Sequence, residues 1–439
     1  MNNTKAQKII SASGLAALTA AFFLWWSNTS YSLSGRVAAT VSVLLFAAVC
    51  LRFVPGFVSF LREKQSEATE ADGDDGVCAK IFAAILLWEL LLVFTVFFIR
   101  RIKGSDGSLF GSLDYWLYLD SHHYLDIARD WYLSEGDPDR LVQLVFLPGY
   151  PVAVRLMHLL VPDYTIAGFS VSMLCFGGSG CMLYKLARLD CERKTALYAV
   201  LFFCLIPGSF FFAAPMSESL FILLSLCCLY YTRRGKTLVA CLFGMYAAFT
   251  RSLGILLVVP VLLELISGRR RARGYFACLL IPMGFAAYLL INCLVAGDPF
   301  KFMEYQREHW GQSLGWFFGT AAYQLENFSA GLAGGKTSAL GLWLPNLTAQ
   351  LLSLIIMIPA AKKLRPSYTA HFIVYYAVAI GATWLLSAPR YLAAQYCLPM
   401  AAAYLDKEWG RSFTVPALIL CVSMGFAYLV CFCGGWQVW

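Results

Sequence analysis

The sequence predicts an all-α protein that crosses a membrane many times. Hydrophobic residues make up 59% of the 439 residues and charged residues only 14%, whereas soluble globular proteins usually contain about a quarter charged residues. The apolar residues are gathered in runs close to the roughly 20 residues that a membrane helix needs. Lysine and arginine lie in short clusters between these runs, which is typical of cytoplasmic loops. The net charge of +8 therefore reflects membrane orientation, and no nucleic-acid partner is expected.

Residues 1–99 are predicted to form N-terminal transmembrane helices. The spans lie near Ile9–Trp26, Val37–Phe60 and Ile81–Ile99. The first span has no small-residue cleavage site, so we expect it to be retained and not removed as a signal peptide. Residues 62–80 are polar and acidic without an apolar period, which predicts a solvated cytoplasmic loop. The 15 cysteines lie mostly in apolar runs without metal-type spacing and are interpreted as small core residues.

Residues 100–164 are predicted to form an extracytoplasmic catalytic loop with an interfacial or re-entrant helix. That helix is Pro148–Val161, an apolar segment of marginal length for a span. If it crossed the membrane, every later basic cluster would face outward, so we expect it not to cross. The basic residues at 100–103 do not fit this orientation, because it places them on the non-cytoplasmic side.

The remaining chain is predicted to form a transmembrane bundle at 165–295, an extracytoplasmic loop at 296–342 and C-terminal transmembrane helices at 343–439. The total is roughly 11–13 spans. The loop contains Gly297–Trp310, which has the pattern of an amphipathic helix on the membrane surface. Thr237–Ser267 must be a hairpin of two short helices if the basic clusters on either side of it both face the cytoplasm.

This topology gathers polar residues that are distant in sequence on one side of the membrane. The landmarks on the non-cytoplasmic side are Asp120, Pro148, Pro215–Glu218, Arg251, residues 297–342 and Pro389–Arg390. A site formed by these segments would face away from the cytoplasm.

The stretch Tyr118–Tyr132 concentrates ionisable residues between two apolar segments. It contains Asp120, His122, His123, Asp126 and Asp130. Asp120 precedes a helical apolar pattern, so it is either the N-cap of that helix or a general base, whose basicity partial desolvation would increase. Asp126 and Asp130 lie four residues apart on one helical face, which favours a solvated surface.

The two adjacent histidines do not predict a metal site. Neighbouring side chains on a helix point in different directions, and no third ligand follows at a suitable spacing. A hydrogen bond from one histidine to a substrate hydroxyl or phosphate is the favoured role. The sequence does not support a divalent metal, and no cofactor is expected.

Three charged residues lie beside predicted spans on the non-cytoplasmic side, namely Glu218, Arg251 and Arg390. Glu218 begins a span, so its charge either complements the helix dipole or marks a functional site. Arg251 and Arg390 break the charge rule, which an anionic ligand, or for Arg251 a partner such as Glu218, would explain. Two such arginines suit a phosphate at the depth of lipid headgroups. Gln306 and His309 of the amphipathic segment either anchor it at the interface or contact a sugar.

No glycine-rich phosphate loop or dinucleotide fingerprint occurs in the sequence. A transferase with this sequence is therefore expected to take its donor from the membrane and not from a cytosolic nucleotide sugar.

Several short motifs follow one another in a fixed order. They are Asp-x-x-His-aromatic at Asp120, His123 and Tyr124; aromatic-x-Pro-x-aromatic-Pro at Phe146–Pro151; Pro-x-Ser-Glu-Ser-Leu-Phe at Pro215–Phe221; Thr-Arg-Ser-x-Gly at Thr250–Gly254; Gln-x-x-x-Trp at Gln306 and Trp310; and Pro-Arg-Tyr at Pro389–Tyr391. From about Leu113 onward, the chain resembles the PIG-V-type GPI mannosyltransferases and their bacterial relatives, within the GT-C superfamily of membrane glycosyltransferases. It departs from the family at Leu119, where a tryptophan is usual, and the spans before Ile81 match nothing in it.

The resemblance implies a GT-C architecture and an inverting glycosyltransferase, in particular a mannosyltransferase of GPI-anchor-like biosynthesis. The donor would be a polyprenyl-phosphate sugar, and the acceptor an extracytoplasmic hydroxyl of a glycolipid or glycan. Asp120 would be the general base, and Arg251 or Arg390 would stabilise the leaving phosphate. Other substrate contacts are expected from His123, Tyr124, Glu218, Gln306 and His309.

Two alternatives of other kinds stay open at this point. A protein O-glycosyltransferase of the same fold differs mainly in acceptor loops. A lipid or sugar transporter or flippase would need mid-membrane ionisable groups and an inverted repeat, and neither is evident in the sequence. The short loops favour a bacterial cell membrane over the endoplasmic reticulum.

Overall fold

The computed structural model describes residues 3–69, 76–104, 107–109, 111–118, 120–132, 142–383, 385–436 and 438. Within these residues the chain is built from helices, with one isolated bridge between Leu314 and Ala382. The predicted all-α fold is confirmed.

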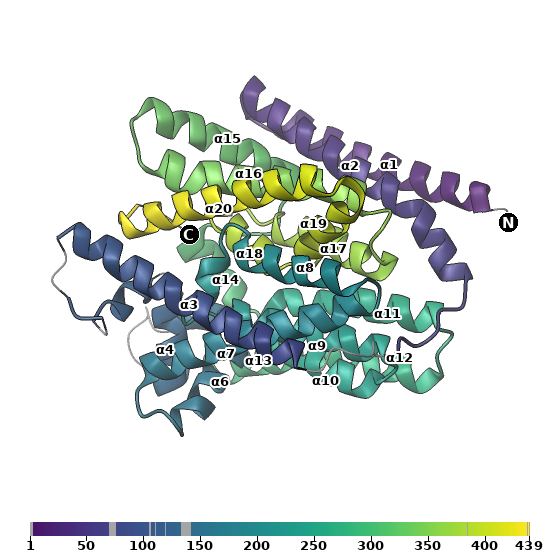
Figure 1. The fold of residues 1–439 in the computed structure, drawn as a ribbon. Helices are drawn as coiled ribbons and strands as arrows, with labels where there is room; N and C mark the ends of the chain where they lie inside the picture. The colour runs from purple at the N-terminus through teal and green to yellow at the C-terminus, as the bar shows by residue number, and fades with distance from the viewer. Residues whose placement is uncertain are drawn as a thin grey trace.

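The helices follow one another along the whole chain (Figure 1). The first half contains α1 (Asn3–Asn28), α2 (Leu33–Arg62), α3 (Val77–Ile102), η1 (Leu113–Trp116), α4 (Ser121–Asp130), η2 (Val142–Val145), α6 (Gly149–His158), α7 (Tyr164–Arg188), α8 (Arg193–Leu205), η3 (Ser209–Ala213) and α9 (Glu218–Arg233). The second half contains α10 (Thr237–Thr250), η4 (Ser252–Leu257), α11 (Val258–Ser267), α12 (Ala272–Cys278), α13 (Leu280–Ala296), α14 (Lys301–Trp310), α15 (Phe317–Ala333), η5 (Ala339–Trp343), α16 (Leu344–Ala360), α17 (Pro366–Ala379), α18 (Ala388–Ala393), α19 (Cys397–Trp409) and α20 (Arg411–Cys433).

Local chemistry explains several of the helix ends. The side chain of Asp163 accepts a hydrogen bond from the Ile166 amide at 2.8 Å and so caps the start of α7. Pro366 stands in the first turn of α17, where its missing N–H costs nothing. Gly297 ends α13 with φ +72°, a conformation that glycine adopts without steric cost.

Seven helical segments among the described residues are long and apolar enough to cross a membrane. They are Thr4–Asn28, Leu33–Arg62, Val77–Ile102, Tyr164–Arg188, Ala272–Ala296, Ala339–Ala360 and Arg411–Cys433. Shorter apolar helices at Thr237–Thr250 and Ser252–Ser267 form the hairpin that the sequence required. The chain is therefore an integral membrane protein with many helices, while the exact number of spans stays a prediction.

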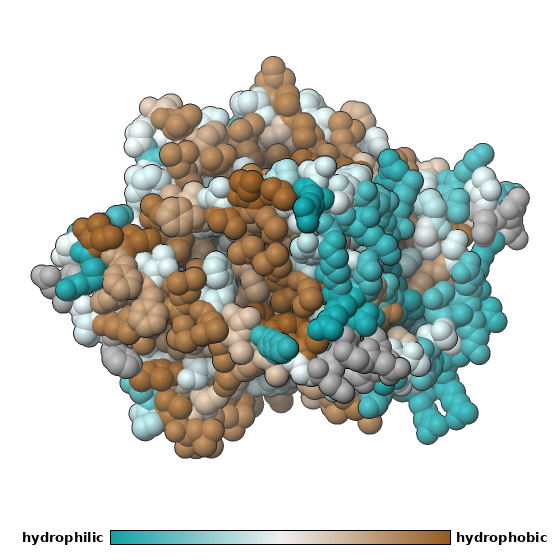
Figure 2. Space-filling view, viewed as in Figure 1, coloured by the Kyte–Doolittle hydropathy of each residue, from teal (hydrophilic) through white to brown (hydrophobic). Residues whose placement is uncertain are grey.

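Most of the helices run roughly along one direction (Figure 1), so the molecule has two ends. The helices α4 and α6 lie at one end, and the N-terminus and α12 lie towards the other. Hydrophobic residues cover much of the surface in this view, and hydrophilic residues gather towards the α12 end (Figure 2). Such a broad exposed apolar surface is the surface of a protein that faces lipid. We call the α4 end outer and the α12 end inner, following the predicted orientation.

The segment expected to be interfacial or re-entrant is the short helix α6, with ten residues. At 1.5 Å per residue it is about 15 Å long, too short to span a bilayer. The expected amphipathic helix is α14, in which no residue is fully buried.

One helix of the expected loop 296–342 was not anticipated. The helix α15 packs against α2, where the rings of Phe46 and Phe317 lie 4.5 Å apart. Glu326 of α15 accepts a hydrogen bond from the Ser32 amide at 2.5 Å. Because α15 mixes small, polar and apolar residues, its sequence does not stand out as a span.

Part of the expected acidic loop 62–80 is ordered along the inner end. The Gln65 amide donates to the Ser267 carbonyl and the Ala68 amide to the Arg233 carbonyl, both at 3.0 Å. Residues 70–75 of this loop lie outside the described residues, as do Leu119 and the segment 133–141.

Candidate active site

Asp120 precedes α4 but does not cap it with its side chain. Its backbone is helical, with φ −70° and ψ −17°, and the side chain makes no capping hydrogen bond. Capping residues usually have extended backbones. Instead, Asp120 Oδ2 accepts a hydrogen bond from Arg390 Nη2 at 2.5 Å, across 270 residues of sequence. The side-chain cap that the sequence allowed is therefore absent, and the role of Asp120 as a general base stays a prediction.

Glu218 joins the two arginines that the sequence singled out. Its Oε1 lies 2.6 Å from Arg251 Nη1 and 2.9 Å from Arg390 Nε. We call Asp120, Glu218, Arg251 and Arg390 the outer cluster. It comes from the start of α4, the start of α9, the turn after α10, and α18. The two carboxylates and two guanidinium groups balance in formal charge, so each buried charge has an opposite neighbour.

The two carboxylates of the outer cluster differ in exposure. The side chain of Glu218 is 1% exposed, whereas that of Asp120 is 27% exposed. Glu218 contacts both arginines, and among the ion pairs of the described residues Asp120 contacts Arg390 alone. Glu218 can therefore hold the arginines in place, while Asp120 is the carboxylate that an incoming molecule can reach.

Ser217 belongs to the site although the sequence analysis did not single it out. Its hydroxyl lies 2.8 Å from the Tyr124 hydroxyl and accepts a hydrogen bond from Arg251 Nη1 at 3.0 Å. The Arg251 guanidinium carbon lies over the Tyr391 ring, 4.8 Å from the ring centroid, which is a cation–π contact. Ser217 lies within the Pro215–Phe221 motif, and that motif was the only signal that could have found it.

The helix α18 is fixed at the site from both ends. The Asn346 side chain of α16 accepts a hydrogen bond from the Ala388 amide at 2.6 Å and donates one to the Leu386 carbonyl at 2.9 Å. The Tyr375 hydroxyl donates to the Tyr391 carbonyl at 2.8 Å. These bonds set the direction in which Arg390 leaves the backbone.

The turn after α10 is pressed against the start of α6. A Cβ added at Gly149 would lie 2.7 Å from the Thr250 Cα, so only glycine allows this approach. The Tyr246 hydroxyl donates to the Gly149 carbonyl at 2.8 Å. The contact places the residue next to Thr250, Arg251, at the outer cluster.

His123 stacks on Phe146, with ring centroids 4.6 Å apart and an angle of 19° between the planes. Phe146 also contacts Trp310 of α14 edge to face at 6.0 Å. Burial lowers the pKa of His123 below its usual 6.5, although the neighbouring Asp120 and Asp126 act in the opposite direction. The imidazole is therefore neutral at pH 7 and can both donate and accept a hydrogen bond.

With this geometry in view, the chain can be compared with known proteins. Residues 102–276 match a family model described as mannosyltransferase (PIG-V). We refer to residues 102–276, which are similar to this family, as the PIG-V segment. The PIG-V segment contributes Asp120, Glu218 and Arg251 to the outer cluster, whereas Arg390 lies beyond it.

Several relatives of the chain are animal proteins. GPI alpha-1,6-mannosyltransferase 2 of Cricetulus griseus is 29% identical over 220 residues, which cover 45% of this chain and 40% of that protein. The Homo sapiens protein of the same name is 29% identical over 215 residues, with the same coverage. The match thus spans well under half of the length of these relatives.

A solved structure of ArnT from Cupriavidus metallidurans bound to undecaprenyl phosphate is also similar. The TM-score is 0.47 at 13% sequence identity, and the match covers 79% of this chain and 77% of that chain.

Two of the predicted contacts lie away from the outer cluster. Gln306 of α14 donates its side-chain amide to Gln312 at 2.9 Å. His309 is exposed and packs against the rings of Tyr305 and Trp310. Among the described contacts, α14 approaches the PIG-V segment through Trp310 and Phe146, so the sugar contacts expected of Gln306 and His309 stay a prediction.

The expected solvated face of α4 is present. Arg129 Nη2 lies 2.7 Å from Asp126 and 3.2 Å from Asp130, and the Arg129 side chain is 52% exposed. Such exposed pairs contribute little to stability. Asp126 lies on the same short segment as Asp120 but pairs with an exposed arginine instead of the outer cluster. It is therefore a matched control for substitutions of Asp120.

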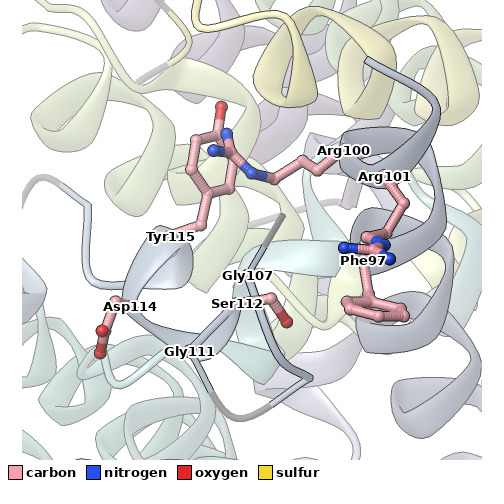
Figure 3. Close-up of a pocket in the computed structure, with 8 residues that line it drawn as sticks. All are labelled: Phe97, Arg100, Arg101, Gly107, Gly111, Ser112, Asp114 and Tyr115. Atoms are coloured by element: carbon pink, nitrogen blue, oxygen red, sulfur yellow. The ribbon is translucent and has the colours of Figure 1, made fainter. Parts of the chain in front are cut away.

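Arg100 and Arg101, which do not fit the predicted orientation, line a small cavity of about 180 Å³ at the end of α3 (Figure 3). The Arg100 guanidinium stacks on the Tyr115 ring at 3.8 Å, and the Tyr115 hydroxyl donates to the Phe432 carbonyl. Arg101 lies beside Phe97, and Asp114 points away from both arginines. Arg100 thus connects α3 to the loop before the PIG-V motif residues, which gives it a structural role on the outer side.

Among the described residues, no group of three or more His, Cys, Asp or Glu side chains could hold a metal ion. Chemistry at the outer cluster can proceed through a carboxylate base and two guanidinium groups, which are able to accept a proton and to stabilise phosphate charge.

Proposed function

We propose that the chain is an integral membrane mannosyltransferase that transfers its sugar, with inversion, from a polyprenyl-phosphate sugar to an extracytoplasmic hydroxyl of a glycolipid or glycan. The outer cluster is the observation that carries this proposal. It places a partly exposed carboxylate 2.5 Å from a buried guanidinium, with a second guanidinium linked through Glu218. A reaction that takes a proton from a hydroxyl and expels a phosphate needs these two kinds of group together.

In the proposed reaction, Asp120 accepts the proton of the acceptor hydroxyl. The acceptor oxygen attacks the anomeric carbon from the face opposite the phosphate, and a new C–O bond forms. The bond between the anomeric carbon and the phosphate oxygen breaks, and its electron pair leaves with the polyprenyl phosphate. Arg390 and Arg251 offset the charge that develops on that phosphate.

Asp120 is the better base of the two carboxylates. Glu218 is 1% exposed and lies between two arginines, so a substrate hydroxyl has no route to it. Asp120 is 27% exposed and lies at the start of α4, near the neutral imidazole of His123. His123 is half-buried and is suited to orient the sugar. Tyr124 is buried with its hydroxyl 2.8 Å from that of Ser217, so the sugar contact expected of it stays a prediction.

The donor lipid, the acceptor and the surrounding lipids are the proposed partners. The short loops support the bacterial cell membrane as the location, although the named relatives are animal proteins. Immunodetection in fractionated membranes of the native host tests the location, and enrichment in an internal membrane would contradict it.

The test compares Asp120→Asn with Asp126→Asn in purified protein. Both variants exchange a carboxylate for an amide in the same segment, but only Asp120 contacts the outer cluster. The assay follows labelled mannose from a synthetic polyprenyl-phosphate mannose into the lipid and glycan extract of the host. Asp120→Asn is expected to lose about 10²–10⁴-fold in rate, the usual contribution of a general base, and Asp126→Asn is expected to keep the wild-type rate.

If Asp120→Asn transferred mannose at the wild-type rate, Asp120 would not be the general base. Absence of transfer by the wild type, together with movement of labelled lipid across reconstituted vesicles, would favour a transporter.

A further inference from the structure

The cavity at the end of α3 carries two arginines on the side of the membrane where such residues are uncommon. Arg100 and Arg101 belong to the last turn of α3, and both line the cavity (Figure 3). Lysine and arginine are concentrated in the cytoplasmic loops of membrane proteins, so an arginine pair at the outer end needs a local reason. Neither residue belongs to the outer cluster, and the proposed reaction uses neither of them.

The third basic residue at this end of α3, Lys103, is accounted for by another helix. A Cβ added at Gly434, which follows the last residue of α20, would lie 3.3 Å from Lys103 Nζ. The ammonium group therefore lies at the carboxyl end of α20, where a positive charge complements the helix dipole. Arg100 and Arg101 complement the dipole of α3 in the same way, but this does not explain a cavity that both of them line.

Arg100 contacts an aromatic ring instead of a carboxylate. Its guanidinium carbon lies 3.8 Å from the centroid of the Tyr115 ring. Among the described residues, no carboxylate forms an ion pair with it. Stacking uses the flat face of a guanidinium group, whereas the N–H donors point outward from its edge. Arg100 is therefore held in place and keeps donors that can bind an anion.

The rest of the lining leaves room beside the arginines. Gly107 and Gly111 contribute no side chain to the cavity. Its volume of about 180 Å³ corresponds to roughly six water molecules at about 30 Å³ each, which is enough for a phosphate group and too small for an oligosaccharide. Asp114 also lines the cavity, but its carboxylate points away from both arginines (Figure 3). The lining therefore favours a small anionic group.

The cavity lies at the outer end of a lipid-facing stripe of α3, one of the segments long enough to cross a membrane. The exposed apolar residues of the stripe recur at three- and four-residue spacing and are Leu87, Leu91, Phe94, Phe98 and Ile102, with Ile102 86% exposed. At 1.5 Å per residue the stripe is about 22 Å long, more than the roughly 15 Å that one leaflet contributes to the hydrocarbon core. Phe97, next to Phe98, lines the cavity. A lipid whose acyl chains lie along the stripe would bring its headgroup to the two arginines.

We propose that this cavity binds the phosphate of an anionic phospholipid from the surrounding bilayer, with the acyl chains along α3. Guanidinium groups match a phosphate in charge and in planar geometry, and basic pockets between membrane helices bind anionic headgroups. The lipid would contact the loop that Tyr115 ties to α20, just before the segment that carries Asp120. The inference does not depend on the proposed function.

The first test measures lipid binding to the purified protein by native mass spectrometry. The probes are dioleoyl phosphatidylglycerol, phosphatidylcholine with the same acyl chains, and inorganic phosphate. The wild type is expected to bind one phosphatidylglycerol about tenfold more tightly than phosphatidylcholine. Arg101→Gln removes one guanidinium group without removing the contact between Arg100 and Tyr115. It is expected to raise Kd for phosphatidylglycerol about tenfold, equivalent to about 1.4 kcal/mol.

Arg155→Gln is the matched control. Arg155 of α6 is also exposed at the outer end and lies 5.8 Å from the centroid of the Trp131 ring, but it does not line the cavity. This variant is expected to bind phosphatidylglycerol like the wild type. Equal changes of Kd in the two variants, or equal affinity of the wild type for the two lipids, would overturn the proposal. Displacement of phosphatidylglycerol by inorganic phosphate would overturn it as well, because the cavity would then hold a free anion.

The second test follows binding through stability, with each protein compared to itself without lipid. A ligand that binds only the folded state raises the thermal midpoint. In detergent, phosphatidylglycerol is expected to raise the midpoint of the wild type and of Arg155→Gln by the same amount and that of Arg101→Gln by clearly less. An equal shift in all three proteins would place the lipid elsewhere and overturn the proposal.

Discussion

The two ends of α9 carry ion-pair clusters that differ in how well they are satisfied. The outer cluster begins at Glu218, the first residue of α9, and the inner cluster contains Arg233, the last residue, about 22 Å away along the helix. The inner cluster consists of Asp190, Arg233, Glu264 and Arg365, with Tyr368 and Ser367. Both clusters are largely buried arginine–carboxylate groups in the same bundle.

In the inner cluster, every carboxylate oxygen accepts a hydrogen bond. Arg233 binds both oxygens of Asp190 at 2.7 and 2.8 Å, and Arg365 binds both oxygens of Glu264 at 2.5 and 2.9 Å. In both clusters one arginine Nε, that of Arg390 and that of Arg233, has no partner with hydrogen-bond geometry within the described chain. Only in the outer cluster do both oxygens of a buried carboxylate, those of Glu218, also lack such a partner, although its ion pairs are close.

We interpret the difference as that between a structural cluster and the proposed catalytic one. Buried polar groups in proteins are usually hydrogen-bonded, because an unsatisfied group loses its interaction with water. The two-pronged arginine bonds of the inner cluster join α9 to the turn before α8 and α11 to the start of α17, and the bond from Arg233 to the Tyr368 hydroxyl joins α9 to α17. The buried carboxylate of the outer cluster is held by ion pairs alone, so this cluster is less firmly fixed than the inner one, and it lies next to Asp120, the carboxylate that a substrate can reach.

The largest effect is expected from Arg233→Met in the inner cluster. It leaves Asp190 without its main partner, and removal of one member of a buried pair destabilises a protein by about 3–5 kcal/mol. Thermal unfolding in detergent, followed by tryptophan fluorescence, measures the loss. The double variant Arg233→Met/Asp190→Leu is expected to recover much of it. If Arg233→Met were as stable as the wild type, the inner cluster would not have the structural role that distinguishes it from the outer cluster.

Arg390→Met in the outer cluster is expected to act mainly on catalysis. Loss of a group that stabilises transition-state charge typically costs about 10²–10³ in rate. The measurement is kcat and KM for the polyprenyl donor, with the thermal midpoint determined in parallel. Arg390→Lys keeps the charge without the planar fork and is expected to recover only part of the rate. A midpoint as low as that of Arg233→Met, with normal kinetics in the folded fraction, would assign Arg390 to stability instead.

Ser217→Ala is expected to have a smaller effect, because it removes one hydroxyl that bridges Tyr124 and Arg251. Each such hydrogen bond contributes about 0.5–1.5 kcal/mol. A lower kcat with an almost unchanged thermal midpoint would identify Ser217 as a positioning residue of Arg251. Ser217→Thr retains the hydroxyl and is the matched control. A fall in midpoint without a change in kcat would contradict this role.

The smallest effect concerns the pH dependence of stability. Because burial holds the folded pKa of His123 below 6.5, the unfolded chain binds more protons near that pH. The stabilising contribution of neutral His123 is complete above pH 6.5 and is lost as the pH falls through the folded pKa. His123→Phe, which keeps a ring against Phe146, is expected to lose less stability on acidification than the wild type. Thermal unfolding above and below pH 6.5 measures this, and parallel curves for the two proteins would contradict it.

Much of the architecture follows from local sequence patterns. Apolar runs of membrane length predict the long helices, and the basic clusters require the short hairpin Thr237–Ser267, which is present as α10, η4 and α11. The same patterns bring Asp120, Glu218, Arg251 and Arg390 to one side of the membrane. They could not reveal α15, whose mixed composition carries no clear period.

The sequence by itself determined the class of protein, the chemical groups available and the end of the molecule at which they meet, since hydropathy and charge act locally along the chain. Only the tertiary structure decided which partners they have. Arg390 contacts a carboxylate 270 positions earlier, and Ser217 links Tyr124 to Arg251 across three helical segments. An apolar groove of about 1100 Å³ beside α18 likewise exists only because α8, α16, α19 and α20 pack around it. Such contacts depend on how whole helices pack, and no short stretch of sequence encodes that.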